Sequence, residues 1–356
     1  MTLDVVKTIL PGLFSFGLGV IFAHFLARFL SARRMWKKRA GKRTLSGEDA
    51  PIFNALHKER EVGVPKMGGA VVWASVLSTA ALFWLIPFYL PADIFSKLDF
   101  VSRGQTWLPL AALIVGALVG LLDDFLEVKG TGGHIAGGLS LMKRLTVVAC
   151  VALLAGLWFY YKLEVESIAL PFVGEVGVGI WFVALFVLIA LAVYSGGVID
   201  GIDGLAGGVF ASIFSAYAFI AFFQSQINVA AFCAAVSGAL LAFLWFNIPP
   251  ARFYLSETGT MSLTLALTIV AFMTDALGEG RGIAVLPIIA APLLVTTLSV
   301  IIQVASKRWR GKKILLVAPL HHHFEALGWP PYKVTMRYWV LATMCAAAGT
   351  IVALVG

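Results

Sequence analysis

The feature that most constrains this chain is a series of long, almost uncharged apolar runs. A helix needs roughly 20 apolar residues to cross the hydrocarbon core of a bilayer. Ten runs come close to that length or exceed it, which predicts an all-α, polytopic membrane protein with about ten transmembrane helices. The runs lie at about 8–30, 68–90, 107–122, 142–161, 178–194, 205–223, 228–246, 260–274, 282–306 and 334–355.

The composition excludes a water-soluble enzyme. Of the 356 residues, 60% are hydrophobic and only 13% are charged, whereas a soluble globular domain carries about 25% charged residues. The three cysteines lie within apolar runs without a pairing pattern, so no disulfide framework is expected. Because no internal repeat or linker is visible, we expect residues 1–356 to form a single integral-membrane domain.

The basic residues divide unevenly between the two sides of the expected bundle. The loops after the first, third, fifth, seventh and ninth runs, taken with Arg28, hold 22 of the 27 Lys and Arg residues. The other loops and both termini hold the remaining 5. Because loops rich in Lys and Arg stay in the cytoplasm, the first set is predicted to be cytoplasmic and both termini to lie outside.

Carboxylates at the membrane edge mark the cytoplasmic loops. Asp123 and Asp124 follow the third run, Asp200 and Asp203 the fifth, and Glu257 the seventh. Acidic residues are costly in such a place and are functional candidates there. Adjacent side chains on a helix diverge by about 100°, so Asp123 and Asp124 are expected to have different roles. Asp200 and Asp203 share one face if their segment is helical.

Five carboxylates on one side would repel one another without a cation among them. Such hard oxygen ligands favour Mg²⁺, with Mn²⁺ as the alternative, and these ions are commonly shared with substrate phosphates. The competing interpretation is that each acid caps a helix or pairs with a Lys or Arg of the same loops. That interpretation accounts for a single acid more easily than for all five.

Other polar residues of these loops fit an anionic substrate. His321, His322 and His323 are consecutive, and no cysteine lies in a cytoplasmic loop, so zinc is disfavoured. Imidazoles that hydrogen-bond an anion fit the location better. Lys143 and Arg144 have two interpretations: they reach a phosphate beside the paired aspartates, or they extend to lipid headgroups.

Several short motifs occur in a characteristic order from about residue 50 to the C-terminus. They are Val64–Gly69, Leu122–Phe125, Asp200–Ala206, Phe246-Asn247, Leu298–Ser306 and Pro319–Pro330. In order and spacing they resemble the phospho-N-acetylmuramoyl-pentapeptide transferase family of lipid I synthases, a branch of the polyprenyl-phosphate N-acetylhexosamine-1-phosphate transferase superfamily. The aspartate motifs are typical of the superfamily. The His-His-His-Phe-Glu stretch is typical of the muramoyl-pentapeptide branch.

The resemblance implies a reaction and a place. The family transfers phospho-N-acetylmuramoyl-pentapeptide from its UDP carrier to undecaprenyl phosphate in peptidoglycan biosynthesis, with UMP leaving and Mg²⁺ required. It implies a homodimer in the bacterial cytoplasmic membrane, with its active site facing the cytoplasm. Carried over by position, the expected catalytic residues are Asp123, Asp124, Asp203 and His322. The expected metal ligands are Glu257 and Asp123, and the expected substrate-binding residues are Lys143, Asp200, Asn247, Tyr254, Gln303, His321 and His323.

The sequence departs from the family pattern at several motif positions. An Asn and a Thr of the family read Gly197 and Ile199 here, and Phe-Met-Gly-Asp reads Tyr-Leu-Ser-Glu257. Gly-Thr-Pro-Thr ends in Lys66, and the basic residue expected shortly after the paired aspartates is Glu127. Glu257 keeps the negative charge but adds one methylene.

These departures keep other functions open. The alternatives are a related transferase that uses another UDP-sugar, and an inactive relative that acts as a binding scaffold. An ion-coupled transporter ranks below the enzyme, because transporters place such groups near the bilayer midplane and often contain inverted repeats. For the enzyme itself, both direct attack by the lipid phosphate and a covalent aspartyl-phosphate route are compatible with the sequence.

Overall fold

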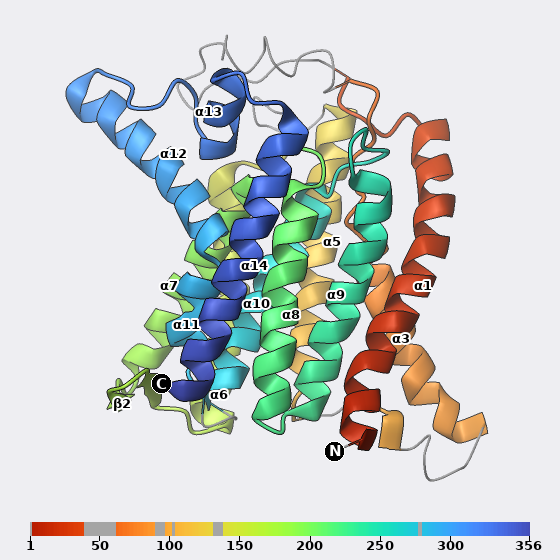
Figure 1. Ribbon diagram of the computed structural model, residues 1–356, viewed down its shortest axis with the longest axis vertical. Helices are drawn as coiled ribbons and strands as arrows, with labels where there is room; N and C mark the ends of the chain where they lie inside the picture. The colour runs from red at the N-terminus through yellow and green to blue at the C-terminus, as the bar shows by residue number, and fades with distance from the viewer. Residues whose placement is uncertain (1, 39–61, 90–96, 102–103, 131–137, 277–279) are drawn as a thin grey trace.

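The computed structural model describes residues 2–38, 62–89, 97–101, 104–130, 138–276 and 280–356. Long helices run side by side along the longest axis of the molecule (Figure 1). They are α1 (Thr2–Ala32), α3 (Ala70–Tyr89), α5 (Trp107–Lys129), α6 (Leu141–Lys162), α7 (Trp181–Ser195), α8 (Leu205–Phe223), α9 (Ile227–Asn247), α10 (Ser256–Ala276) and α14 (Pro331–Val355). The other helices are η1 (Gly196–Ile199), α11 (Gly282–Ile289), α12 (Ala291–Arg310) and α13 (Leu320–Ala326).

The number of spans agrees with the prediction. Among the residues that the structure describes, nine helices are long and apolar enough to cross a membrane. The pair α11 and α12 adds a tenth if it counts as one span, although the two helices are bent by 68°. Pro292 lies in the first turn of α12, where a missing N–H is tolerated but continuation of the preceding helix is not. The all-α, polytopic prediction is confirmed.

Three local features differ from the expected spans. Helix α5 continues to Lys129 and carries the acids after residue 122 in its last two turns, because the helix ends only at Gly130, a left-handed cap with φ of 67°. Helix α10 begins at Ser256 rather than near residue 260. An antiparallel hairpin of β1 (Ser167–Leu170) and β2 (Gly174–Gly177) was not predicted, since strands of four residues leave little sequence pattern.

Helices α8, α9 and α10 form the interior of the bundle, and α10 is almost completely enclosed. Its buried hydroxyls do not need water, because Thr264, Thr268 and Thr274 each donate to the carbonyl four residues earlier. Helix α5 approaches α10 closely, since a Cβ at Gly116 or Gly120 would collide with the α10 backbone. This close approach positions the acidic end of α5 against the first turn of α10.

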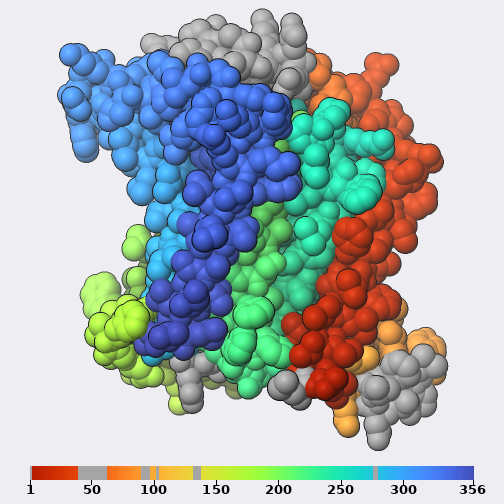
Figure 2. Space-filling view, viewed as in Figure 1, coloured from red at the N-terminus to blue at the C-terminus, as the bar shows by residue number. Residues whose placement is uncertain are grey.

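The two ends of the molecule differ. Both termini and the hairpin lie at one end, and α13 and the start of α14 lie at the other (Figure 1). The chain leading out of α12 projects beyond the body at the α13 end (Figure 2). Termini at the same end require an even number of crossings, which agrees with ten spans.

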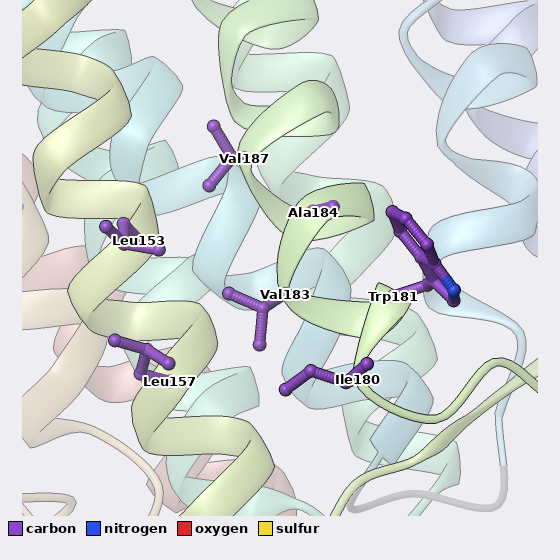
Figure 3. A pocket seen from close by; sticks show the side chains of 7 residues that line it. All are labelled: Leu153, Leu157, Ile180, Trp181, Val183, Ala184 and Val187. Atoms are coloured by element: carbon purple, nitrogen blue, oxygen red, sulfur yellow. The ribbon is translucent and has the colours of Figure 1, made fainter.

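An apolar hollow of about 340 Å³ opens between α6 and α7 (Figure 3). Its lining carries no titratable side chain, so the hollow offers no group for polar chemistry. The lining residues are Leu153, Leu157, Ile180, Trp181, Val183, Ala184 and Val187.

Candidate active site

The paired aspartates lie in the penultimate turn of α5, and their side chains point to different neighbours. Asp123 Oδ1 accepts a hydrogen bond from the Leu139 N–H at 2.5 Å. Asp124 Oδ2 accepts two from Thr258, at 3.0 Å from its N–H and 2.6 Å from its hydroxyl. Both aspartates are buried. The two side chains therefore diverge as helical spacing predicts. Their hydrogen bonds join α5 to the segment before α6 and to α10.

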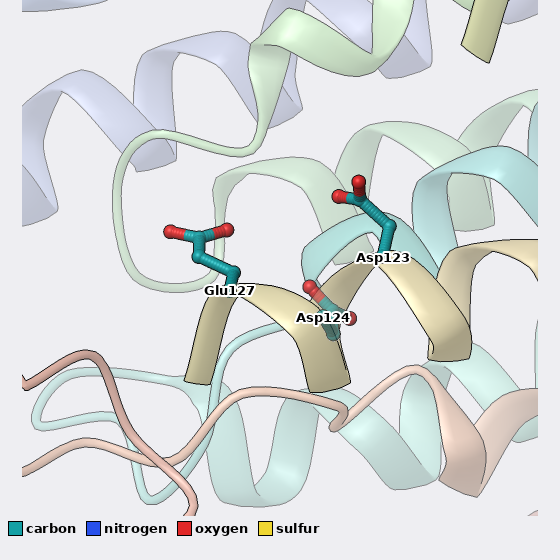
Figure 4. Close-up of side chains that lie close together, drawn as sticks. All are labelled: Asp123, Asp124 and Glu127. Carbon is teal, nitrogen blue, oxygen red and sulfur yellow. The ribbon is translucent and has the colours of Figure 1, made fainter. Parts of the chain in front are cut away.

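Glu127 lies one turn further along α5 and joins the same acidic cluster (Figure 4). Asp123, Asp124 and Glu127 each offer a carboxylate oxygen, and these oxygens lie within 4.8 Å of one another. Hard oxygen donors this close are the donor set that Mg²⁺ prefers. The cluster also has two basic neighbours, which determine how the negative charge is balanced.

The first basic neighbour is Arg144, in the first turn of α6. Ser140 caps that helix, and Arg144 Nη1 forms an ion pair with Glu257 Oε1 while lying 3.9 Å from Asp123 Oδ2. The Tyr194 hydroxyl donates to the other oxygen of Glu257 at 3.4 Å. Two carboxylates, one from α5 and one from α10, therefore converge on a single cationic group. Lys143, beside Arg144, is exposed.

The second basic neighbour is Lys66, from the segment that precedes α3. Its Nζ lies 2.5 Å from Glu127 Oε2 and 4.0 Å from Asp124 Oδ1. Burial by itself lowers the pKa of Lys66, but Glu127 and then Asp124 outweigh it, so this pKa lies above its ordinary value. The segment is held in place by Tyr254, whose N–H donates to the Pro65 carbonyl at 2.9 Å.

Asp200 and Asp203 occupy a turn between η1 and α8 rather than a helix. Asp200 Oδ2 accepts from the Ser256 N–H at 2.8 Å, and Asp203 Oδ2 accepts from the Ala251 N–H at 3.1 Å. Asn247 ties the same parts together. Its Oδ1 accepts from the Gly204 N–H at 2.9 Å, and its amide donates to the carbonyl of residue 253 at 2.8 Å.

The histidines of α13 pack on that turn. The rings of His321 and His322 lie 4.3 Å apart, and a Cβ at Gly201 would collide with the Nε2 atoms of both. Only glycine fits this approach. His322 Nδ1 lies 2.7 Å from Glu325 Oε2, one turn later, which fixes the ring orientation. His323 points elsewhere, and its Nδ1 accepts from the backbone N–H of residue 316 at 3.2 Å.

The predicted residues thus form two groups that share one connecting segment. Residues 247–258 contact the acidic cluster through Thr258 and Glu257, and they contact the Asp200–Asp203 turn through backbone N–H groups. Gln303 lies apart on α12, where its amide bonds the backbone of residues 314 and 315. All of these residues lie at the α13 end of the molecule, opposite the termini.

Sequence reasoning did not assign some residues of the site. Thr258 gave no signal, because a hydroxyl two residues before the expected start of a span near residue 260 is unremarkable. Glu325 could have been found, since it stands three residues after His322 in a motif already singled out. Tyr194 lies at the end of an apolar run, where aromatic residues are ordinary membrane-interface residues.

Comparison with known proteins identifies the family. Residues 106–275 match the model of glycosyl transferase family 4. The chain is 33% identical to a phospho-N-acetylmuramoyl-pentapeptide-transferase of Chloroflexus aggregans over 90% of this chain and 85% of that protein. The corresponding Chloroflexus aurantiacus protein is 32% identical over 99% and 91%, and that of a Geobacillus species 32% over 82% and 84%.

The chain belongs to the phospho-N-acetylmuramoyl-pentapeptide-transferase family. The match to glycosyl transferase family 4 begins just before α5 and ends with α10, so it includes the acidic cluster, Arg144 and the Asp200–Asp203 turn. The similarity to the transferases continues through α13, where the histidines stand. The resemblance stated from the motifs is confirmed, and the chain is a multi-pass membrane protein of a transferase family.

Proposed function

We propose that this chain transfers phospho-N-acetylmuramoyl-pentapeptide from its UDP carrier to undecaprenyl phosphate, giving lipid I and UMP in peptidoglycan biosynthesis. The observation that carries the proposal is the meeting, at one end of the bundle, of the buried acids of α5 with the Asp200–Asp203 turn and its histidines. Membership of a family whose relatives bear that transferase name supports it. We treat residues 1–356 as one catalytic membrane domain.

The chemistry fits a site made of charges rather than of a strong nucleophile. Phosphoryl transfer depends mainly on positioning and on neutralising the phosphates. A phosphate monoester has a second pKa of about 6, so the lipid phosphate is largely ionised at neutral pH. One of its oxygens attacks the β-phosphorus of the UDP-sugar, the bond from that phosphorus to UMP breaks, and UMP leaves with the electron pair. We favour this direct route over an aspartyl phosphate.

Each expected residue except Lys143 keeps a role in this proposal. Asp123 and Asp124 bind and orient the lipid phosphate, and Asp203 with His322 acts at the diphosphate. Arg144 neutralises phosphate charge beside them, a position that Lys143 was expected to fill. For the nucleotide and sugar we propose a set drawn from the Asp200–Asp203 turn, the end of α9 and the segment after it, α12 and α13: Asp200, Asn247, Tyr254, Gln303, His321 and His323.

A divalent cation fits the acids, and we propose Mg²⁺, with Mn²⁺ as the alternative. Asp123 and Glu257 both approach the guanidinium of Arg144, and this convergence of two carboxylates on one cationic group supports them as ligands. Glu127 is the less suitable ligand because Lys66 contacts its carboxylate. When bound between Asp123 and Glu257, the ion would neutralise the diphosphate and the UMP that leaves.

We place the protein in the bacterial cytoplasmic membrane with the acidic cluster facing the cytoplasm. The division of 22 basic residues against 5 supports this orientation, and the termini then lie outside. One substrate is a lipid and the other arrives from the cytoplasm, which is why the site lies at the end of the bundle. A homodimer is proposed from the family resemblance.

The decisive test is release of UMP by the purified protein. Undecaprenyl phosphate and UDP-N-acetylmuramoyl-pentapeptide should give UMP and lipid I with Mg²⁺ and none with a chelator. UDP-N-acetylglucosamine serves as the matched control substrate. Faster release from that sugar would favour the related transferase, and no release from either would refute the enzyme.

A further inference from the structure

The pairing of Lys66 with Glu127 forms a charge arrangement beside the aspartates that the proposed function does not use. Lys66 comes from the segment before α3 and Glu127 from α5, 61 residues later in the chain. Lys66 Nζ lies 2.5 Å from Glu127 Oε2 and 4.0 Å from Asp124 Oδ1. The Lys66 side chain is 21% exposed and that of Glu127 14%. The pair is therefore largely withdrawn from solvent, where charge interactions are screened less.

Lys66 and Glu127 neutralise each other. They are in direct contact, so together they bring no net charge to the site. The cation comes from the segment before α3, whereas Glu127 and the two aspartates beside it belong to α5.

The Lys66–Glu127 pair lies beside Asp124, and the charge of Lys66 therefore affects that aspartate. Asp124 is completely buried, and Thr258 donates two hydrogen bonds to one of its oxygens, Oδ2. The other oxygen, Oδ1, is the one that Lys66 approaches. Without Lys66, two carboxylates would face the same space with no cation between them, and removing one partner of a buried pair leaves an uncompensated charge. Substrates that carry phosphates would be repelled there.

We propose that Lys66 is a positioning residue of this enzyme: it offsets the negative charge of Glu127 and thereby permits a phosphate to approach Asp124. Lys66 and Glu127 act as one unit, in which the lysine is needed because the glutamate is present. The inference rests on the proposed function for the identity of the substrates, since it concerns phosphate binding at the same site.

The test compares three variants of the full-length protein in detergent: Lys66→Met, Glu127→Gln and the double variant. Lys66→Met keeps the side-chain length and removes the cation, so kcat/KM for UMP release should fall about thirtyfold. Glu127→Gln should lose no more than about threefold, and adding it to Lys66→Met should recover most of the loss, because the local charge returns to its original value. A raised KM for undecaprenyl phosphate should account for most of the fall in kcat/KM of Lys66→Met.

A second readout does not depend on turnover. Undecaprenyl phosphate raises the unfolding temperature of a protein that binds it, and we expect this rise to be smaller in Lys66→Met and restored in the double variant. If the wild type binds undecaprenyl phosphate but releases no UMP, the proposed function fails while the inference is still judged on binding of the lipid phosphate. If Lys66→Met does not fold, the charge-reversed pair Lys66→Glu with Glu127→Lys takes its place and should retain binding of the lipid phosphate.

Three outcomes would overturn the inference. A structural role for Lys66, as a tether of its segment to α5, predicts that the double variant is as impaired as Lys66→Met and that Glu127→Gln is equally harmful. Wild-type kcat/KM in Lys66→Met would show that the cation is not needed. Loss of undecaprenyl phosphate binding in the charge-reversed pair would likewise show that the two residues are not interchangeable as a charge unit.

Discussion

The two ends of α10 carry one buried or half-buried carboxylate each, and their surroundings are opposite. At the first turn, Glu257 contacts Arg144, Tyr194 and Thr260, and its charge is shared with the acids of α5. At the last turn, Asp275 is 7% exposed and accepts from the Ala169 N–H of β1 at 3.3 Å. Within the described ranges, no ion pair reaches Asp275.

The two carboxylates differ in whether other charges converge on them, so position at a membrane edge does not by itself distinguish a candidate site residue from a structural one. Asp275 holds the hairpin against the end of α10, which is a structural role performed by backbone hydrogen bonding. Glu257 stands in a network of two acids and a guanidinium that can accept a substrate or a metal. The following predictions test whether the two ends differ in function as they differ in contacts.

The largest effect is expected from Asp124→Asn. Thr258 fixes one oxygen of Asp124 and leaves the other to the charged part of the site. Replacing the carboxylate should lower UMP release by at least about a thousandfold while the protein stays folded in detergent, because the amide oxygen can still accept from Thr258. Asp203→Asn should behave in the same way. A wild-type rate in either variant would return that aspartate to a helix-capping role.

Glu257→Gln should lower Mg²⁺-dependent UMP release by about a hundredfold, because the amide has no charge to share with a cation. Glu257→Asp, which introduces the family residue, should have a smaller effect but still release UMP more slowly than the wild type. The shorter side chain would no longer reach the position that Glu257 holds against Arg144 and Tyr194. The measurement is a Mg²⁺ titration of all three proteins. An unchanged rate and metal requirement in the Gln variant would remove Glu257 from the ligand set.

Gly201→Ala should slow UMP release by about tenfold. The new Cβ would collide with the Nε2 atoms of His321 and His322 and push α13 from the Asp200–Asp203 turn. Gly17→Ala in α1 is the matched control, because a Cβ there meets nothing within 4 Å. Equal rates in the two variants would contradict the packing of the histidines on the turn.

Asp275→Asn, at the far end of α10, should change UMP release by less than about threefold. It should lower the free energy of unfolding by about 1 kcal/mol, because the amide oxygen of Asn is a weaker acceptor for the Ala169 N–H than the charged carboxylate. Urea unfolding followed by tryptophan fluorescence measures this. A loss of activity comparable to that of Glu257→Gln would break the comparison between the two ends.

No effect on activity is expected from cysteines that report sidedness. In a background without the three native cysteines, Leu327→Cys lies at the α13 end and Val173→Cys in the hairpin turn, and both positions are exposed. A membrane-impermeant thiol reagent added to intact cells should label position 173 only. Labelling of 327 from outside would reverse the orientation and the assignment of the site to the cytoplasm.

Much of the fold could be read from the sequence because hydropathy is a local property. Apolar runs alone predicted the ten spans, and the uneven division of Lys and Arg gave an orientation. The boundaries of α5 and α10 were missed for a related reason. A hydropathy run stops at Asp123 and resumes after Glu257, whereas the helices continue because their carboxylates find partners inside the bundle.

The residue types of the site were also evident from the sequence, since paired aspartates and consecutive histidines are rare at a membrane edge. Their partners were not. Arg144 meets Glu257 across 113 residues of sequence, and Lys66 meets Glu127 across 61. The sequence by itself determined a membrane bundle, a family and a set of acids at one end. Only the tertiary structure decided which cation faces which acid, because that depends on how closely packed helices align, as where Gly120 of α5 meets the backbone of Glu257.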